Sequence, residues 1–269
     1  MYIENVFLFY AFMYQIAFGH FIEQCLPKIR YYFKLKNVVK NVKFCIPKSR
    51  NNLFVKNILN LLNFTNDEIV ILDFETVIHC KNFYYSNYEC CDFNVDKIET
   101  FNLIREKLCI KKNVLQNRNV YVKRNNDVIL NLDCHNIGIH RRIINENILI
   151  ENLKSIGFEI ITLGDCDLRS KSELLSNINI LITQTGGTMY NLIFSNTPNH
   201  ILFLSNQFPL HANYIHDLLP KLIFYTQTHV KIFKYESYIK NCDKKNDMND
   251  PFIVNVDQII RYCKDYEGF

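Results

Sequence analysis

Two patterns of hydrophobic and polar residues, one typical of strands and one of helices, follow each other along the second half of the chain. Short aliphatic runs, typical of buried strands, are separated by segments in which apolar residues recur at helical spacing. The runs predict strands over residues 119–124, 158–163, 178–183, 200–204 and 221–225. The segments between them predict helices over residues 145–157, 170–176, from Thr188 onward and over 211–219. Strands that alternate with helices in this way are typical of βαβ units, so we expect a doubly wound domain on a parallel sheet.

The first half is less regular but also mixes helix and strand. Its apolar start predicts a core helix, which continues over residues 7–36 with an interruption near Gly19 or Pro27. Further elements are predicted over residues 43–47 (strand), 51–64 (helix), 68–73 (strand), 76–85 (extended) and 95–110 (helix), and a last amphipathic helix over 254–266. The polar residues 111–117 are the best candidate boundary. We therefore expect an α/β protein with domains 1–115 and 116–269, and a packing of the last helix back on the first domain stays open.

Composition and charge fit a folded protein with two domains. A length of 269 residues suits two domains of about 100 to 150 residues each. Hydrophobic residues make up 48% and charged residues 22%, as in ordinary globular proteins. The net charge of +4 is mild and no long basic block is present, which argues against nucleic acid as a partner and weakly favours an anionic ligand.

Neither a membrane segment in the first 29 residues nor a zinc or disulfide framework of the cysteines is favoured. The start is apolar, but it has no basic region and is interrupted by Glu4, Gln15 and Glu23, so we expect a core helix and no stable membrane insertion. A cytoplasmic protein is the corresponding expectation. None of the ten cysteines stands in a CxxC pair, which favours buried reduced thiols over a zinc site or a disulfide framework.

Two of the seven glycines, Gly186 and Gly187, follow an aliphatic strand directly. In a parallel α/β sheet, ligands bind at the carboxyl ends of the strands. Glycines allow a tight turn and a close approach to the main chain, and the free amides of the next helix favour an anion such as phosphate. Thr185 and Thr188 add hydroxyl groups. A purely structural turn is the alternative, since neither a Walker motif nor a GxGxxG fingerprint is present.

Three arginines lie between the end of the predicted strand 119–124 and the start of the predicted helix 145–157. Arg124 ends a predicted strand, and Arg141 and Arg142 precede a helix that starts at Asn145 and Glu146. Three guanidinium groups at the strand ends of one domain would hold a diphosphate by bidentate bonds, although each is also an ordinary surface charge. Asn145 as the N-cap and Glu146 in the first turn have a complete structural explanation.

His20 and Glu23 are three residues apart in an apolar run, which places them on one face of a helix. A core histidine with its hydrogen bonds satisfied is one explanation. A histidine beside a carboxylate is also a plausible general base.

These segments, in this order, resemble glycosyltransferase family 61, which includes plant xylosyltransferases and dystroglycan-type N-acetylglucosaminyltransferases. The matching residues are His20, Phe21, Glu23, Leu26, Pro27, Tyr121, Arg124, Arg141, Arg142, Asn145, Glu146, Gly157, Phe158, Gly186, Asn191, Leu192 and Phe194. Three departures stand beside them. Thr185 occupies the place of the family's usual His, Gly187 and Thr188 replace Ala-Gly, and residues 169–177 lack a Glu-Gln pair.

The resemblance implies a GT-B architecture, in which two Rossmann-like domains face a cleft. It also implies an inverting, metal-independent enzyme that needs no cofactor. The donor would be a nucleotide sugar, most simply UDP-linked, and the acceptor a glycan or glycoprotein. Eukaryotic members enter the secretory pathway, so its lumen is the alternative location.

The resemblance also assigns roles to residues. The donor would be bound by Arg124, Arg141, Arg142, Asn145, Glu146, Thr185, Gly186, Gly187, Thr188 and Asn191. Glu23 or His20 would take the acceptor proton. Two other hypotheses stay open: a catalytically inactive relative, motivated by Thr185, and an unrelated sugar-nucleotide enzyme such as an epimerase, for which no nicotinamide fingerprint is present. The sequence does not indicate the oligomeric state.

Overall fold

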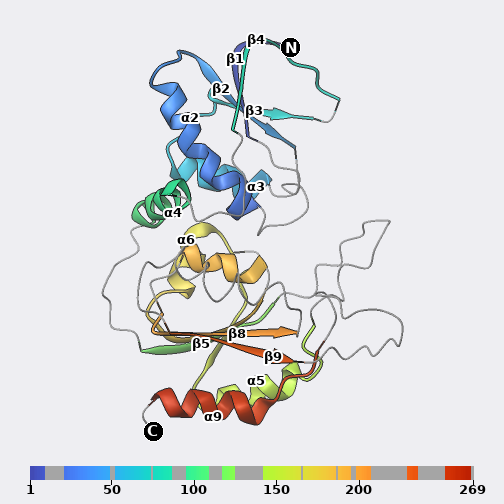
Figure 1. Cartoon of the computed structure of the whole chain (residues 1–269), viewed down its shortest axis with the longest axis vertical. Coiled ribbons are helices and arrows are strands. Elements are labelled where there is room, and N and C mark those ends of the chain that lie inside the picture. The colour runs from blue at the N-terminus through green and yellow to red at the C-terminus, as the bar shows by residue number, and fades with distance from the viewer. Residues whose placement is uncertain are drawn as a thin grey trace. The chain divides into compact units, whose positions relative to one another are not determined.

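The computed structural model describes residues 1–9, 21–48, 52–73, 75–86, 95–108, 117–124, 142–164, 166–185, 187–194, 198–206, 229–235 and 252–267. The chain divides into two compact units (Figure 1). Unit 1 comprises Met1–Ile110, Asp167–Ser172 and Tyr190–Phe194, and unit 2 comprises Lys111–Cys166, Glu173–Met189 and Ser195–Phe269. Each contains a parallel sheet, so the predicted α/β fold with two Rossmann-like units is confirmed.

Unit 1 is built on a four-stranded parallel sheet with the strand order β3-β2-β1-β4. Its strands are β1 (Tyr2–Leu8), β2 (Val42–Pro47), β3 (Ile69–Leu72) and β4 (His79–Tyr85). Its helices are η1 (Phe21–Cys25), η2 (Leu26–Lys28), α2 (Ile29–Lys36), α3 (Asn52–Leu61) and α4 (Val95–Lys107). The elements predicted from residue 43 to residue 110 are therefore present, with shifts of a few residues at their ends.

The start of the chain is a strand, and the prediction of a core helix there is wrong for Tyr2–Leu8. Tyr2 and Glu4 are exposed while Ile3 and Asn5 are buried, which is the two-residue alternation of a strand. The long apolar run that follows hid this short signal. Residues 10–20, the middle of the predicted helix, lie outside the described residues.

One face of the unit 1 sheet, here called the Phe44 face, packs against helices. Phe7 and Phe44 lie side by side in neighbouring strands. Tyr32 of α2 lies with its ring 5.7 Å from that of Phe7 and 4.9 Å from that of Phe44, and Phe64 lies 5.0 Å from Phe44. Burying each of these side chains contributes about 1.5 to 3 kcal/mol, so this aromatic cluster stabilises the packing of α2 on the sheet.

The opposite face is called the Leu8 face. Val70, Cys45, Leu8 and Tyr85 form one row across all four strands, because each is the register partner of the next. Cys45 is buried and Tyr85 is exposed. Val6, Leu8, Cys45 and Val70 of this face belong to an apolar cluster that, among the described residues, draws only on strands and on the short connection between β3 and β4. No described helix contributes to it.

Unit 2 is built on a five-stranded parallel sheet with the strand order β6-β5-β7-β8-β9. Its strands are β5 (Arg118–Val122), β6 (Glu159–Ile161), β7 (Ile178–Gln184), β8 (His200–Asn206) and β9 (His229–Tyr235). The helices in this part of the sequence are α5 (Glu146–Ser155), α6 (Leu168–Leu174), η4 (Gly187–Phe194) and α9 (Val256–Glu267). Strand β9 is not among the predicted elements. The predicted helix 211–219 and strand 221–225 lie outside the described residues.

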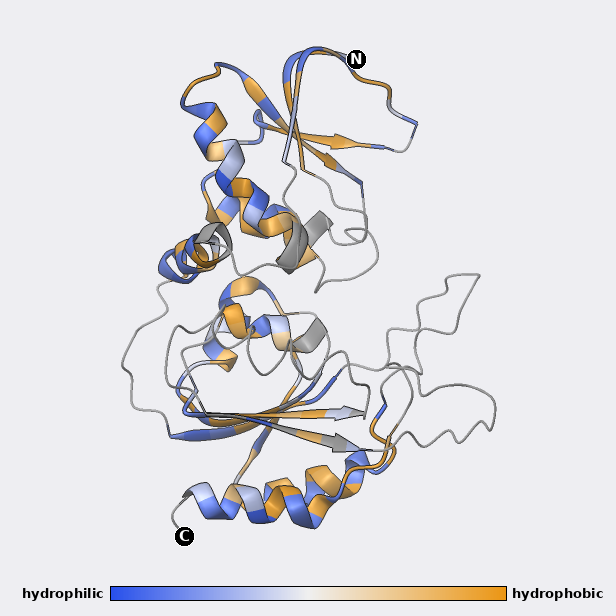
Figure 2. Cartoon of the chain, in the orientation of Figure 1, coloured by the Kyte–Doolittle hydropathy of each residue, from blue (hydrophilic) through white to orange (hydrophobic). Residues whose placement is uncertain are grey.

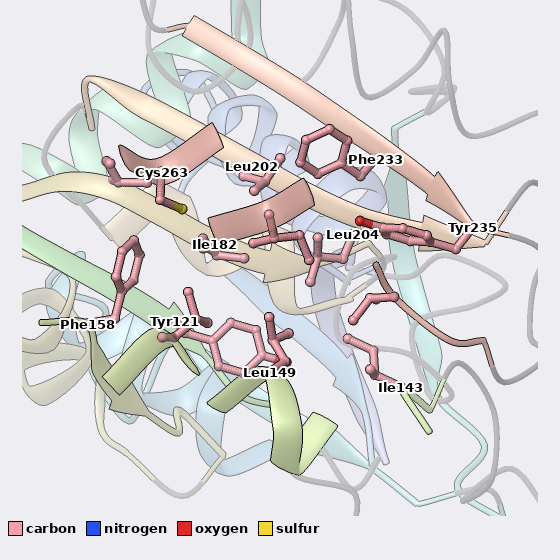
Figure 3. Close-up of a cluster of buried hydrophobic side chains, with 14 of the residues drawn as sticks. Tyr121, Ile143, Leu149, Phe158, Ile182, Leu202, Leu204, Phe233, Tyr235 and Cys263 are labelled. Carbon is pink, nitrogen blue, oxygen red and sulfur yellow. The ribbon is translucent and has the colours of Figure 1, made fainter. Parts of the chain in front are cut away.

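Helices α5 and α9 cover one face of this sheet (Figure 1). Leu149 of α5 and Cys263 of α9 pack with Tyr121, Ile182 and Leu202 from the strands, as Figure 3 shows. Apolar and polar residues are interleaved along α9 (Figure 2), as in a helix with one buried side. The last helix thus packs against the sheet of unit 2. The assignment of acceptor and donor roles to 1–115 and 116–269 stays a prediction.

The described cysteines are free thiols, namely Cys25, Cys45, Cys80, Cys166 and Cys263. Burial raises the pKa of the Cys25 and Cys45 thiols to about 12, so both are protonated at neutral pH. None of the helices in the described ranges is long and apolar enough to cross a membrane.

An ion pair at the start of β5 gives unit 2 a pH-dependent contribution to stability. The Arg118 guanidinium donates to both carboxylate oxygens of Glu159, at 2.8 and 2.5 Å. This pairing lowers the pKa of Glu159 below its usual value. A lowered pKa in the folded state stabilises the protein above the unfolded pKa, and the stabilisation is lost as pH falls through the folded pKa.

We expect Glu159→Gln to lower the free energy of unfolding at neutral pH by at most about 1 kcal/mol, because the carboxylate is about half exposed. The deficit should disappear in acid well below the ordinary carboxyl pKa of 4.5, where the wild-type group is protonated. Urea unfolding at both pH values measures this, with Glu151→Gln on the exposed side of α5 as the control. A deficit that is the same in acid would contradict the assignment.

Candidate functional site

Thr185 fixes the point at which the chain leaves the carboxyl edge of the unit 2 sheet. Its backbone N–H donates to the carbonyl of Leu204 at 3.0 Å, and its Oγ1 donates to Oγ of Ser205 at 3.2 Å. Both hydroxyl groups are buried. Thr185 therefore extends the pairing of β7 with β8. Its hydroxyl, at the position where the family usually has a histidine, is engaged by Ser205. Gly187 and Thr188 begin η4, whereas Gly186 lies outside the described residues.

Gln184, the last residue of β7, is a candidate that the sequence analysis missed. Gln184 is 1% exposed, and neither its Nε2 nor its Oε1 has a partner at good hydrogen-bond geometry. An unsatisfied buried polar group costs about 1 to 3 kcal/mol, and this one stands at the carboxyl edge of the sheet, where parallel α/β folds bind ligands. The signal in the sequence is an amide that closes an otherwise aliphatic strand.

Tyr121 and Glu146 form a buried pair between β5 and α5. The Tyr121 hydroxyl donates to Oε1 of Glu146 at 2.7 Å. Burial, followed by the Glu146 charge and hydrogen bond, raises the pKa of Tyr121 well above its usual value. A side-chain contact from Gln184 acts on that pKa in the opposite direction. Glu146, predicted as a donor ligand, thus has a structural partner and lies in the first turn of α5, where the helix dipole stabilises a carboxylate.

Asn145 occupies the N-cap position as predicted, but its side chain does not cap the helix. Its Nδ2 donates to the carbonyl of Val254 at 2.8 Å, and the N–H of Val254 donates to its Oδ1 at 3.0 Å. Next to this pair, the N–H of Phe252 donates to the carbonyl of Arg142 at 2.9 Å. The segment before α5 is therefore tied to the segment before α9.

We expect Asn145→Ala to lower the free energy of unfolding by about 1 to 3 kcal/mol, because both backbone groups of Val254 lose their partner. Hydrogen exchange at the Val254 amide should speed up in the same variant. Asn152→Ala, on the exposed side of α5, is the matched control. Unchanged exchange at Val254 would show that this amide pair does not hold the segment.

The predicted arginines have different surroundings. Arg124 follows the end of β5 and is partly buried, and burial lowers the pKa of its guanidinium. Arg142 has an exposed side chain on a backbone that is fixed by Phe252. Arg141 and His20 lie outside the described residues, and Glu23 lies in η1 with no description of its side chain. Within the described parts of the chain, no cluster of three or more His, Cys, Asp or Glu residues could hold a metal ion.

Asn191 belongs to unit 1 and lies beside a buried lysine. Nζ of Lys171 donates to Oδ1 of Asn191 at 3.4 Å and lies 5.3 Å from the centre of the Phe54 ring. An ammonium group can only donate, so the amide oxygen of Asn191 faces the lysine. The sequence analysis missed Lys171. Its signal was the spacing of Leu168, Lys171 and Leu175, which places the lysine on the buried side of α6.

A known protein family matches most of the chain. The family model described as Glycosyltransferase 61 matches residues 18–202. None of the curated proteins compared with the chain matches it. Among solved structures, 17 chains match. One, the E. coli heptosyltransferase WaaC with ADP, aligns over 98% of this chain and 99% of its own, at 8% identity and a TM-score of 0.40.

Proposed function

Because the chain belongs to glycosyltransferase family 61, and so is a glycosyltransferase, we propose that it transfers a sugar from a UDP-linked donor to a hydroxyl of a glycan or glycoprotein. The proposal includes inversion at the anomeric carbon and no requirement for a metal ion. The observation that carries it is the position of Arg124 and Arg142. They flank the connection from β5 to α5, at the edge of a parallel sheet where anionic ligands bind.

In the proposed reaction, the acceptor hydroxyl attacks the anomeric carbon from the side opposite the leaving nucleoside diphosphate. The new bond forms between that oxygen and the carbon while the bond from the carbon to the phosphate oxygen breaks. Glu23 or His20 takes the hydroxyl proton. Arg124, Arg142 and the first amides of η4 stabilise the negative charge that develops on the diphosphate.

The other predicted donor residues act in this proposal in two ways. Gly186, Gly187 and Thr188 form the turn that approaches the phosphates, with Arg141 and Asn191 as further ligands. Asn145 and Glu146 act mainly by position, because each side chain already has a partner in unit 2.

A second candidate is a relative that binds the nucleotide sugar without turning it over. Thr185 favours it, because the hydroxyl that stands in place of the family's His is engaged by Ser205. Both candidates predict nucleotide binding, so turnover is the measurement that separates them.

The first experiment is the release of nucleoside diphosphate from a panel of UDP-, GDP- and dTDP-sugars by the wild type and by Arg142→Ala. We expect release from one donor, and a loss of about 10- to 100-fold in the variant, because a charge-assisted hydrogen bond is removed. Arg261→Ala, an exposed arginine of α9, is the matched control. Binding without release would favour the inactive relative, and an equal loss in the control would contradict the phosphate assignment.

A further inference from the structure

Two aromatic side chains are exposed together on the Leu8 face of unit 1. Phe83 is 53% exposed and Tyr85 is 65% exposed. Their ring centres are 6.1 Å apart with an angle of 32° between the rings. Both point to the same side of the edge strand β4, because alternate residues of a strand share a face. They lie beside Val6 and Leu8 of β1.

The exposed apolar surface of this pair is small. At about 150 to 250 Å² for a whole aromatic side chain, the two exposed portions amount to roughly 250 Å². A specific protein interface needs about 800 Å² from each partner. The neighbours of Tyr85 in its row are buried or partly buried and add little. The pair is thus too small for a protein partner or a second copy of this chain, and it matches one or two six-membered rings.

A sugar ring is the ligand whose chemistry fits these surroundings. A pyranose offers a face of C–H groups that packs on an aromatic ring, and hydroxyl groups around its rim that need polar partners. Polar groups flank the aromatic pair. Lys81, two residues before Phe83 on the same side of β4, lies 3.7 Å from the carboxylate of Glu4.

The pair also lies at the edge of the sheet where a substrate is expected. Leu8 and Tyr85 are register partners and are the last residues of β1 and β4. They therefore mark the carboxyl edge of the sheet, where parallel α/β folds bind ligands. The connection that begins after β1 carries His20 and Glu23, the predicted bases, in its sequence.

We propose that Phe83 and Tyr85 form an acceptor subsite that stacks a pyranose ring of the glycan acceptor. The identification of that sugar as the acceptor rests on the proposed function. Binding of a sugar to the pair does not depend on it.

The test is saturation-transfer NMR of the full chain with two neutral probes, xylobiose and N,N′-diacetylchitobiose. We expect at least one probe to bind, and its dissociation constant to rise about 10-fold in Phe83→Ala and again in Tyr85→Ala, as for other ring-on-aromatic stacking. Tyr85→Phe keeps the ring and should keep binding. Tyr2→Ala is the matched control, because Tyr2 is 69% exposed beside His79 at the other end of the same strands.

Absence of binding by both probes would overturn the inference, as would an equal loss in Tyr2→Ala. Light scattering measures self-association of the same variants. If Phe83→Ala or Tyr85→Ala weakened self-association and left sugar binding unchanged, the pair would be an interface between copies and the inference would be overturned. Release of nucleoside diphosphate without an acceptor is measured in parallel. If the wild type releases none but Phe83→Ala still loses sugar binding, the proposed function fails and the subsite stands.

Discussion

Transfer to the acceptor is expected to fall by about 100- to 10,000-fold in Glu23→Gln, the range that a general base contributes. Glutamine keeps the size of the side chain but cannot take a proton at neutral pH. The dissociation constant of the donor should not change, because the diphosphate ligands are untouched. The measurement is the rate of transfer at saturating donor, together with displacement of a labelled nucleotide.

The neighbouring histidine supplies the contrasting result. His20→Asn should lower transfer less than Glu23→Gln if the carboxylate is the base, and more if the imidazole is. Glu75→Gln, an exposed glutamate of the same unit, should leave transfer unchanged. Full activity in both variants would contradict a base in this segment.

Phe44→Ala is expected to lower the free energy of unfolding of unit 1 by about 3 to 5 kcal/mol. Phe44 is completely buried. The centre of its ring lies 4.8, 4.9 and 5.0 Å from the ring centres of Phe9, Tyr32 and Phe64. The substitution removes the shared centre of this cluster and leaves a cavity into which its neighbours relax only in part. Urea unfolding followed by tyrosine fluorescence and far-UV circular dichroism measures the loss.

Phe83→Ala is the matched substitution in the same sheet, and it should change stability by less than about 0.5 kcal/mol because the ring is more than half exposed. A similar loss in both variants would mean that the Phe83 ring is part of the core. That result would also remove the basis of the acceptor subsite.

Four of the five described strands of unit 2, β5 to β8, were predicted, most clearly where a buried parallel strand appears in the sequence as an unbroken aliphatic run. Residues 178–183 were predicted as a strand, and β7 spans Ile178–Gln184. Strand β1 was not predicted, since its seven residues run into a longer apolar segment. Strand β9 was not predicted either, because its apolar residues are interrupted by Lys231 and Lys234 and keep no strict two-residue alternation, with Ile232 and Phe233 adjacent.

The sequence indicated where some residues of the candidate site stand on their helices and strands, but not which groups they hydrogen-bond. Asn145 stands at the start of α5 as the sequence indicates, but its partner Val254 follows from no local pattern. Lys171 and Gln184 were missed for a related reason. A single polar residue on an apolar face or strand signals a function only when the structure shows that it is buried and what surrounds it.

The pairing of Asn145 with Val254 also sets an order of events during synthesis. The two residues are separated by 109 positions. At about 5 to 20 residues per second, the ribosome needs roughly 5 to 20 s to add that length. During this delay the start of α5 has neither its backbone partners at Phe252 and Val254 nor the apolar side of α9. Strands of unit 2 that form before residues 256–267 are made therefore lack the cover of α9 on one apolar face, and a chaperone can bind such a face.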